Sequence, residues 1–303
     1  MSIKAIVLDI DGTLTNDKKE ITPMTKEALL KAQAMGIKLI LASGRPTKGL
    51  RKLAHELEMD QNHGYFVSYN GAIGLDCQTD EILFNQSLSI EEAKKILDHL
   101  KHFDRVRPMV DKDDYMYVTN VFDGWITLDN KPFNVMEYES RGGNYKLCEV
   151  DDLSEFVDFR LNKILTFADP DYLLENYQKM KEPFKDEFSC MFTSPFYFEF
   201  TAKGIDKAKA LDAILRPIHI KPEEVIAFGD GQNDISILTY SGHGIAMENA
   251  VDELKEIADE ITLSNENDGI DNVNIKFTKN DRLKITNFDH IYSSRESRTS
   301  FVL

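Results

Sequence analysis

Ile3-Lys4-Ala5-Ile6-Val7-Leu8-Asp9-Ile10-Asp11-Gly12-Thr13-Leu14-Thr15, near the N-terminus, is the stretch from which the fold is predicted. Its apolar run is typical of a fully buried strand, and the run ends at two aspartates one residue apart. Open α/β sheets bind their ligands at the carboxyl ends of such strands. If the strand pattern continues, Asp9 and Asp11 share a face, and Gly12 lets the chain turn away beyond them.

The two aspartates have two interpretations. Close carboxylates repel one another unless a cation lies between them, and a site made only of oxygen atoms favours Mg²⁺. The structural alternative is a strand end followed by a solvated Asp-Gly turn. The remainder of the sequence has to decide between a metal site and a turn.

Composition limits the classes of protein to which the chain can belong. Its 303 residues suffice for two domains, and a hydrophobic content of 42% can fill their cores. The net charge is −16, from 36 Lys and Arg against 52 Asp and Glu, which argues against nucleic acid or an anionic membrane as a partner. A phosphorylated substrate would therefore need local positive charge.

Targeting signals and cysteines indicate the compartment. No apolar run approaches the roughly 18 residues needed to cross a bilayer, and the N-terminus lacks the features of a signal peptide. The three cysteines, Cys77, Cys148 and Cys190, are far apart and show no C-x-x-C spacing, so neither a disulfide framework nor a zinc site is predicted. We expect a protein of the reducing cytoplasm.

A strand, a helix and a second strand follow one another at the start of the chain. Residues 22–36 form a predicted helix, with Thr22 as N-cap, Pro23 at the first helical position and Gly36 as its end. Residues 37–42 are a second buried strand. This order predicts a right-handed crossover between parallel strands.

Turn residues follow the second and third predicted strands. Ser43 and Gly44 lie between the second strand and a helix predicted for 47–57, where backbone N–H groups can bind phosphate, although Ser-Gly is also a common turn. The third strand, 65–69, is closed by Asn70-Gly71, a strong turn signal for which a structural role is the simpler interpretation.

The pattern changes at about residue 85. We predict helices at 89–101 and 172–181, and short strands at 115–119, 125–127, 164–167, 190–193 and 196–201. These strands do not end in Gly or Asp motifs, so the segment 85–200 is predicted to be an α+β insert and not a continuation of the parallel sheet.

The parallel pattern resumes after the insert. Lys207 precedes a helix at 208–215 for which Asp206 is a plausible N-cap, and the strand 225–228 ends in Gly229-Asp230-Gly231-Gln232-Asn233-Asp234. A helix at 235–241, a strand at 244–247 and a helix at 249–258 follow. Residues 276–303 carry six Lys or Arg and three Asp or Glu without a clear period, and we interpret them as a peripheral tail without an assigned function.

These segments together predict a site for phosphoryl transfer. Carboxylates on two strands can hold one Mg²⁺, while Ser43 and Lys207 neutralise phosphoryl oxygens. One carboxylate is then free to attack phosphorus, and a second can act as general acid and base. Each residue alone has an ordinary structural explanation, but their repetition at strand ends favours function.

The motifs resemble a known family. Asp9-Ile10-Asp11-Gly12-Thr13-Leu14, Ser43-Gly44-Arg45-Pro46, Lys207 and Gly229-Asp230-x-x-Asn233-Asp234 are similar to the four ordered motifs of the haloacid dehalogenase (HAD) superfamily. Asn70-Gly71-Ala72 and Gly244-Ile-Ala-Met-x-Asn-Ala250 resemble its Cof-type branch of phosphatases. The resemblance covers about residues 3–273. It implies a Rossmann-like α/β core of 1–84 and 201–275, with helices on both faces of a parallel sheet, and an inserted α+β cap of 85–200.

The resemblance also implies roles for individual residues. Asp9 would be the nucleophile and Asp11 the acid and base. Phosphate ligands would be Ile10, Ser43, Gly44, Lys207 and Asn233. The Mg²⁺ ligands would be Asp9, the Asp11 carbonyl and Asp230, with Asp234 supporting the metal from behind them. Arg45 and Asn70 are candidate substrate contacts. Ala208 departs from the glycine common in the family, and Lys203 competes with Lys207 for the lysine role.

The expected function is a Mg²⁺-dependent phosphatase for small phosphorylated metabolites, sugar phosphates first, acting through an aspartyl-phosphate. A phosphosugar mutase or phosphotransferase would share every core residue, and a phosphate-ligand binder without turnover is a further alternative. Dehalogenase chemistry is disfavoured, because Asp11 supplies an acid that a halide does not need. Specificity is expected in cap residues such as Tyr115, Tyr117, Trp125 and Arg141. We expect a monomer or weak dimer.

Overall fold

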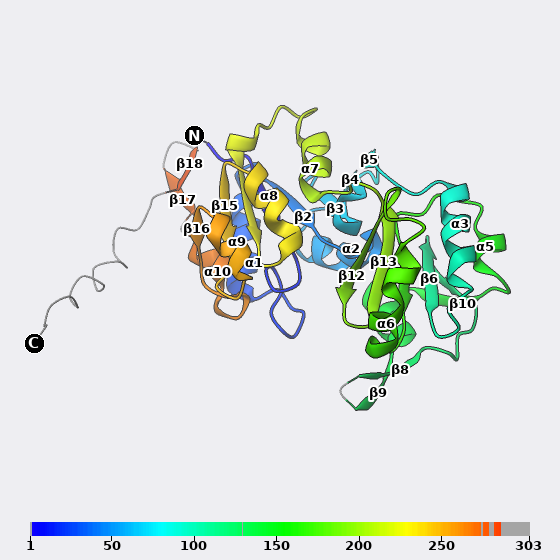
Figure 1. Cartoon of the computed structure of the whole chain (residues 1–303). Helices are drawn as coiled ribbons and strands as arrows, with labels where there is room; N and C mark the ends of the chain where they lie inside the picture. The colour runs from blue at the N-terminus through cyan, green and yellow to red at the C-terminus, as the bar shows by residue number, and fades with distance from the viewer. Residues whose placement is uncertain (1, 129, 274, 279–281, 286–303) are drawn as a thin grey trace, which may run out of the picture.

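The chain folds into two lobes that lie side by side (Figure 1). This computed structural model describes residues 2–128, 130–273, 275–278 and 282–285. One lobe, here called the core, contains an eight-stranded sheet, and the other, here called the cap, contains a six-stranded sheet. Among the described residues, none of the helices has both the length and the apolar character needed to cross a bilayer.

The core sheet is parallel at its centre and antiparallel at one edge. Its strand order is β16-β15-β14-β1-β2-β3-β4-β5, in which β4 and β5 are the antiparallel members. The strands are β1 (Ala5–Leu8), β2 (Lys38–Ala42), β3 (Tyr65–Ser68), β4 (Ile73–Asp76), β5 (Ile82–Asn85), β14 (Val225–Gly229), β15 (His243–Ala246) and β16 (Glu260–Ile261). Ala5 pairs with Lys38 on one side and with Val225 on the other, so β1 lies in the interior of the sheet.

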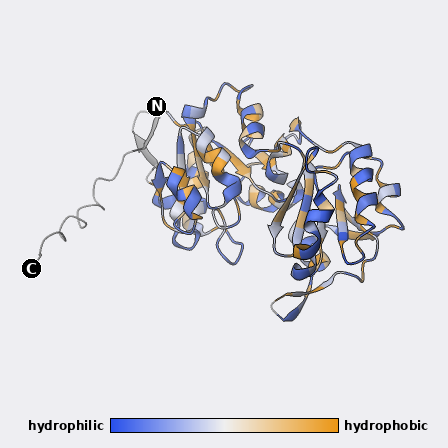
Figure 2. Cartoon of the chain, viewed as in Figure 1, coloured by the Kyte–Doolittle hydropathy of each residue, from blue (hydrophilic) through white to orange (hydrophobic). Residues whose placement is uncertain are grey.

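Helices cover both faces of the core sheet. On one face lie α1 (Pro23–Ala34), α2 (Thr47–Glu56) and α10 (Gly269–Asn272), and on the other lie α7 (Lys207–Leu215), α8 (Ile235–Tyr240) and α9 (Asp252–Ile257). Successive residues of a strand point to opposite faces, so Ile6 and Leu8 pack against the first group while Ala5 and Val7 pack against the second. Both faces are therefore apolar. Figure 2 colours each residue of these elements by its hydropathy.

Short 3₁₀ turns connect several of these elements. They are η1 (Tyr69–Gly71), η2 (Pro222–Glu224), η3 (Gln232–Asp234) and η4 (Asn265–Asn267). Two of them lie at the edge of the sheet where the predicted site residues are found, because η1 directly follows β3 and only two residues separate η3 from the end of β14.

The cap is an antiparallel sheet with one parallel edge. Its order is β10-β7-β6-β11-β13-β12, and only β10 and β7 pair in parallel within it. The strands are β6 (Arg107–Lys112), β7 (Tyr115–Val118), β10 (Lys146–Glu149), β11 (Ile164–Phe167), β12 (Phe188–Ser194) and β13 (Tyr197–Ala202). A separate antiparallel pair, β8 (Trp125–Leu128) and β9 (Lys131–Asn134), extends from this lobe (Figure 1).

The two faces of the cap sheet have different surroundings. Phe198 and Phe200 pack with α3 (Ile90–Leu100), α5 (Leu153–Phe156) and α6 (Pro170–Lys181) in one hydrophobic cluster. The opposite face is partly covered by α4 (Val135–Gly143), whose Val135 packs with Tyr197 of β13. The remainder of that face is available to line a cavity.

The predicted fold class is confirmed, and several elements agree in detail. Thr22 caps α1, its side chain accepting a hydrogen bond from the Thr25 amide at 3.4 Å, and Gly36 follows with a φ of +85°. The antiparallel strands β4 and β5 and the cap elements α4, α5, β6, β9 and β10 were not predicted. Helix α9 is shorter than the predicted 249–258, because the Ala250 amide donates to the Met247 carbonyl in a turn.

The predicted C-terminal tail, 276–303, lies mostly outside the described residues. Only β17 (Ile275–Thr278) and β18 (Arg282–Ile285) are described there, as an antiparallel pair. The predicted boundaries of core and cap stay predictions.

Candidate active site

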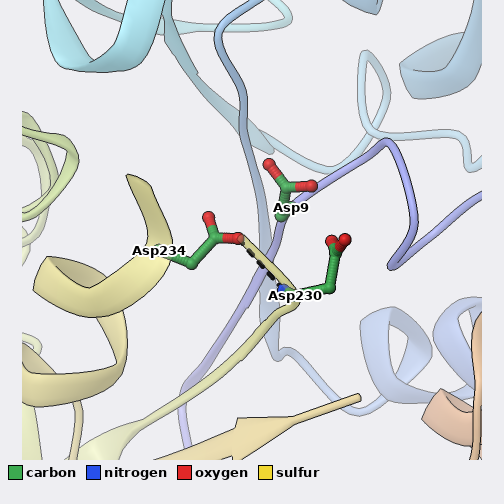
Figure 3. Close-up of side chains that lie close together, drawn as sticks. All are labelled: Asp9, Asp230 and Asp234. Carbon is green, nitrogen blue, oxygen red and sulfur yellow. Dashed lines mark hydrogen bonds between the residues drawn. The ribbon is translucent and has the colours of Figure 1, made fainter. Parts of the chain in front are cut away.

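Two neighbouring strands bring the predicted aspartates together. β1 and β14 pair in parallel, and the Asp9 amide continues this pairing by donating to the Phe228 carbonyl at 3.1 Å. Asp230 directly follows β14. The carboxylates of Asp9, Asp230 and Asp234 each offer an oxygen within 4.8 Å of the others, and Figure 3 shows them converging. Residues more than two hundred positions apart in sequence therefore form one acidic cluster.

A buried lysine connects two of these carboxylates. Lys207, the first residue of α7, is 1% exposed, and its Nζ donates to Asp9 Oδ1 at 2.8 Å and to Asp234 Oδ1 at 2.7 Å. Lys203 lies elsewhere, because its Nζ donates to the Asp186 carbonyl at 2.8 Å. Of the two lysines considered from sequence, Lys207 is the one beside the aspartates.

Asp234 is held by both of its oxygens. Its Oδ2 accepts from the amides of Asp230 at 3.1 Å and Gly231 at 2.9 Å, the former drawn in Figure 3, while Oδ1 accepts from Lys207. Gly229 permits this arrangement, since a Cβ there would lie 2.5 Å from the Cβ of Asp234. With both oxygens occupied by protein donors, Asp234 fits the predicted supporting role better than that of a direct metal ligand.

Asp230 is oriented by the loop that follows β1. Its Oδ1 accepts from the Thr13 hydroxyl at 2.7 Å. Gly12 adopts a φ of +85°, and a Cβ at this position would lie 2.3 Å from Asp230 Oδ2. Burial, together with the charge of Asp234, raises the pKa of Asp230 to about 6, although the Thr13 hydrogen bond opposes the shift. The tight turn predicted at Gly12 therefore also leaves room for a carboxylate.

The residues present fit a divalent metal. Burial and the charge of Asp234 raise the pKa of Asp9 well above its usual value, although Lys207 opposes this. Three carboxylates face a single ammonium group, so the cluster is short of positive charge. All of its candidate metal-binding atoms are oxygens, the donors that Mg²⁺ prefers. A hard cation would supply the missing charge.

Asp11 has partners different from those of Asp9. Strand β1 ends at Leu8, and although the Asp9 amide still pairs with the Phe228 carbonyl, Asp11 lies in the loop beyond. Arg45 donates to both Asp11 oxygens, from Nε at 2.7 Å and from Nη2 at 2.6 Å, and Lys19 Nζ donates to Oδ1 at 2.8 Å. Burial alone would raise the pKa of Asp11, but Arg45 and Lys19 outweigh it and lower the pKa. Arg45, a candidate substrate contact, here holds Asp11.

The remaining predicted residues surround the same strand ends. Ser43 follows β2, is 3% exposed, and accepts at Oγ from the Arg45 amide at 3.2 Å. The backbone amide of Asn70 donates to the Ser43 carbonyl at 3.0 Å, and the side-chain Nδ2 of Asn233 donates to Asn70 Oδ1 at 3.0 Å. A Cβ at Gly44 would lie 3.1 Å from the Asn70 side chain. Asn70 thus both shapes a turn, with a φ of +56°, and joins the site.

Ile10 contributes through its backbone. Its side chain is fully buried in the core, and its carbonyl accepts from the amide and the hydroxyl of Thr15, each at 3.0 Å. These bonds fix the course of the loop from Ile10 to Thr15, which contains Asp11. The predicted phosphate contact of Ile10 stays a prediction.

One large cavity, of about 2180 Å³, borders both the core site and the cap. Trp125 and Arg141 line it, and their role in specificity stays a prediction. Tyr117 instead packs on Phe156, with ring centroids 4.4 Å apart. Sequence reasoning missed the other polar cap residues of the cavity, which include Glu139, Tyr145, Lys163, Thr193, Tyr197 and Glu199.

Comparison with known proteins places this site in a family. The sequence model of the haloacid dehalogenase-like hydrolases matches residues 6–273. The chain belongs to this family. It is 32% identical to a haloacid dehalogenase-like hydrolase from Bacteroides thetaiotaomicron, whose structure superposes with a TM-score of 0.81 and coverage of 89% of this chain and 97% of that one.

Two further relatives have names that specify an activity. The chain is 26% identical to the HAD subclass IIB sugar phosphatase BT4131, with a TM-score of 0.69 and coverage of 88% and 96% of the two chains. It is 29% identical over 276 residues to YcsE of Bacillus subtilis, named a 5-amino-6-(5-phospho-D-ribitylamino)uracil phosphatase, with coverage of 89% and 94%. The resemblance to the Cof-type branch and the expected enzyme class, a HAD-type phosphatase, are confirmed.

Proposed function

We propose that the chain is a Mg²⁺-dependent phosphatase that hydrolyses small phosphorylated metabolites, with sugar phosphates as the preferred class, through an aspartyl-phosphate. The observation that carries this proposal is the buried Lys207 between Asp9 and Asp234, beside Asp230. A nucleophilic carboxylate, a fixed ammonium group and further carboxylates for a metal are the groups that phosphoryl transfer requires.

The metal would be held by Asp9, Asp230 and the backbone carbonyl of Asp11, with Asp234 orienting the amides of Asp230 and Gly231. When bound, Mg²⁺ supplies positive charge that offsets the charge of the phosphoryl group and of the carboxylates. Lys207 and Ser43 would contact other phosphoryl oxygens, with the Ile10 and Gly44 backbone and Asn233 completing the phosphate site.

The residues of the chain divide the reaction into two steps. Asp9 attacks phosphorus, its new O–P bond replaces the bond to the leaving alcohol, and Asp11 donates a proton to that alcohol oxygen. Asp11 then accepts a proton from the water that attacks the aspartyl-phosphate, which releases phosphate and restores Asp9. Arg45 and Lys19 occupy Asp11 and lower its pKa in this conformation, so Asp11 must be released from them before it can carry a proton to a substrate.

The two lobes would have separate tasks. We propose that the core, 1–84 and 201–275, carries the chemistry and that the cap, 85–200, contacts the leaving group across the shared cavity. The relatives named a sugar phosphatase and a ribitylaminouracil phosphatase act, by their names, on phosphorylated polyhydroxyl compounds, which supports this substrate class. A cytoplasmic location and a monomeric or weakly dimeric state complete the proposal.

The test is phosphate release by the full-length chain from p-nitrophenyl phosphate and a panel of hexose and pentose monophosphates, with Mg²⁺ and after chelation. We expect Mg²⁺-dependent release of inorganic phosphate. Conversion of a hexose phosphate into its isomer, without free phosphate, would instead identify a mutase. Binding of sugar phosphates without turnover of any ester would leave only a phosphate-ligand binder.

A further inference from the structure

A buried ion pair lies in the cap wall of the cavity. Lys163 Nζ donates to Glu199 Oε1 at 3.0 Å, and the two side chains are only 9% and 7% exposed. Both residues line the same cavity as Asp9 and Lys207. The pair therefore lines the proposed substrate cavity but has no role in the reaction described above.

The sheet register explains why the pair faces the cavity. Glu199 of β13 pairs with Leu165 of β11, and Lys163 lies two residues before Leu165, so both charged side chains share one face. The neighbours of Glu199, Phe198 and Phe200, point to the other face and pack under the cap helices. The alternation of β13 thus separates an apolar face from a polar one.

Stability alone does not account for this pair. Burying two charges carries a desolvation cost, and a well-packed apolar pair of similar volume often stabilises a fold as much or more. A buried ion pair is therefore weak evidence of a stabilising role. An exposed counterpart in the same lobe, Lys95 with Glu187 at 3.1 Å, has side chains 52% and 55% exposed. The chain could have filled the positions of Lys163 and Glu199 with apolar residues, and instead it lines the cavity with charge.

The surroundings of the pair are rich in hydrogen-bond acceptors. Glu199 Oε1 accepts from Lys163 and also from the Thr193 hydroxyl at 3.0 Å. Glu139 accepts from the Tyr197 hydroxyl at 2.6 Å, and Asp111 from the Tyr145 hydroxyl at 3.1 Å. Burial lowers the pKa of Lys163, but the charges of Glu199, Glu139 and Asp111 outweigh it and raise the pKa. Lys163 therefore stays charged beside Glu199, and Glu139 lines the same cavity.

The ammonium group and the carboxylates in the cap wall indicate which chemical groups of a ligand could bind there. An ammonium group donates hydrogen bonds and a carboxylate accepts them, so together they match neighbouring hydroxyl groups, which do both. The excess of carboxylates disfavours a second anionic group on the ligand, because like charges repel at short range in a poorly solvated site.

We propose that Lys163 and Glu199 form a subsite for hydroxyl groups of the leaving alcohol, so that the substrate is a monophosphate of a neutral, polyhydroxylated alcohol. This inference rests on the proposed phosphatase function and names its substrate class. Bisphosphates and phosphorylated carboxylic acids are poor substrates, because their second anionic group would meet Glu199 and Glu139 in the cavity wall.

The test compares kcat/KM for a hexose monophosphate, the matching hexose bisphosphate and p-nitrophenyl phosphate, whose leaving group has no alcoholic hydroxyl. In the unmodified chain we expect the monophosphate to exceed the bisphosphate by at least about tenfold. In Glu199→Gln, kcat/KM for the hexose monophosphate divided by kcat/KM for p-nitrophenyl phosphate should fall by about 10- to 100-fold. The reason is that a polar site discriminates strongly by its hydrogen bonds to substrate hydroxyls. The preference for monophosphate over bisphosphate should narrow in the same variant.

Controls separate a subsite from a structural role. Glu187→Gln removes the carboxylate of the exposed cap pair and should leave every ratio unchanged. Because Glu199→Gln leaves Lys163 without its partner, the double variant Lys163→Met with Glu199→Met, which buries no unpaired charge, is measured beside it and should show the same fall. A purely structural role would lower all three kcat/KM values together and leave the ratios constant, which would overturn the inference.

The two proposals fail in different ways. If the unmodified chain hydrolyses none of the three esters, the phosphatase function fails and the subsite fails with it. If p-nitrophenyl phosphate is hydrolysed and the ratios do not change in the folded double variant, only the subsite is wrong.

Discussion

Two buried lysines line one cavity, and their surroundings differ. Lys207, on the core side, is 1% exposed and donates to Asp9, at the end of β1, and to Asp234, in the turn after β14. Lys163, on the cap side, is 9% exposed and donates to one glutamate on the face of a mostly antiparallel sheet. The core thus presents a compact charged cluster suited to a phosphoryl group, which every phosphomonoester shares. The cap presents mixed donors and acceptors suited to the part of the substrate that varies.

The largest effect is expected on the core side. Asp9→Asn should lower kcat by at least about 10⁴-fold, as removal of a catalytic nucleophile does in other enzymes, because an amide cannot form the aspartyl-phosphate. Lys207 keeps its bond to Asp234, so circular dichroism and thermal unfolding should show a folded protein. The exposed Asp80→Asn, which loses only a surface pair with Arg51, is the matched control. Full activity of Asp9→Asn would refute its role as nucleophile.

Chelation should also act on the core alone. EDTA should abolish turnover of p-nitrophenyl phosphate and of sugar phosphates alike, because Asp9 and Asp230 then repel an incoming phosphoryl group. Added Mg²⁺ should restore both rates to the same extent. Loss of one substrate only, or undiminished rates in the chelator, would contradict a metal that serves the shared phosphoryl group.

Replacing Lys207 or Lys163 by methionine tests whether the core side of the cavity serves the phosphoryl group and the cap side serves the variable part of the substrate. Either change leaves a buried carboxylate without its partner, and we expect each to lower the free energy of unfolding by about 3–5 kcal/mol. Lys207→Met should lower kcat for every ester, whereas Lys163→Met should act mainly through KM for hydroxylated substrates. Urea unfolding and steady-state kinetics measure the two effects.

The matched control for the core lysine is Lys203→Met, because Lys203 only donates to the Asp186 carbonyl at the surface. It should remain close to the unmodified enzyme in both measurements. Equal losses of kcat in Lys203→Met and Lys207→Met would mean that the segment leading into α7, and not the Lys207 ammonium, is responsible.

The smallest expected effect concerns the turn beneath the aspartates. Gly12 and Gly36 share a φ of +85°, but a Cβ would lie 2.3 Å from Asp230 Oδ2 at Gly12 and would meet nothing within 4 Å at Gly36. Alanine at either position should cost about 1–3 kcal/mol of stability through backbone strain. Only Gly12→Ala should also weaken Mg²⁺ binding, which would raise the Mg²⁺ concentration that gives half of the maximal rate. Equal Mg²⁺ requirements in both variants would show that Asp230 is not a ligand.

The core side could be predicted from sequence because local patterns position its groups. Asp9 and Asp230 each follow an apolar strand, and Lys207 begins a helix capped by Asp206, whose side chain accepts from the Lys209 amide at 3.0 Å. Parallel strands end at the same edge of a sheet, so strand order alone brings Asp9 and Asp230 together. The contact between Asp11 and Arg45 was not predicted, because no spacing rule relates side chains on two separate loops.

The cap side could not be predicted, for a physical reason. Phe198, Glu199 and Phe200 alternate as expected of a two-faced strand, and a single charged residue in such a strand ordinarily faces solvent. Whether its face borders water or a cavity depends on how two lobes pack, which no local pattern encodes. The antiparallel edge strands β4 and β5 were missed because their short runs contain Gly74 and end in polar turns.

The interior position of β1 also has a consequence for biosynthesis. β1 lies between β2 and β14, and Lys207 reaches Asp9 across 198 positions of sequence. A ribosome releases β2 soon after β1, but it releases β14 only after the whole cap has been made. The nascent chain therefore carries β1 with one edge unpaired through the synthesis of the intervening lobe, and long-range pairing of this kind is slow. The active site consequently cannot assemble before the cap and β14 have been made.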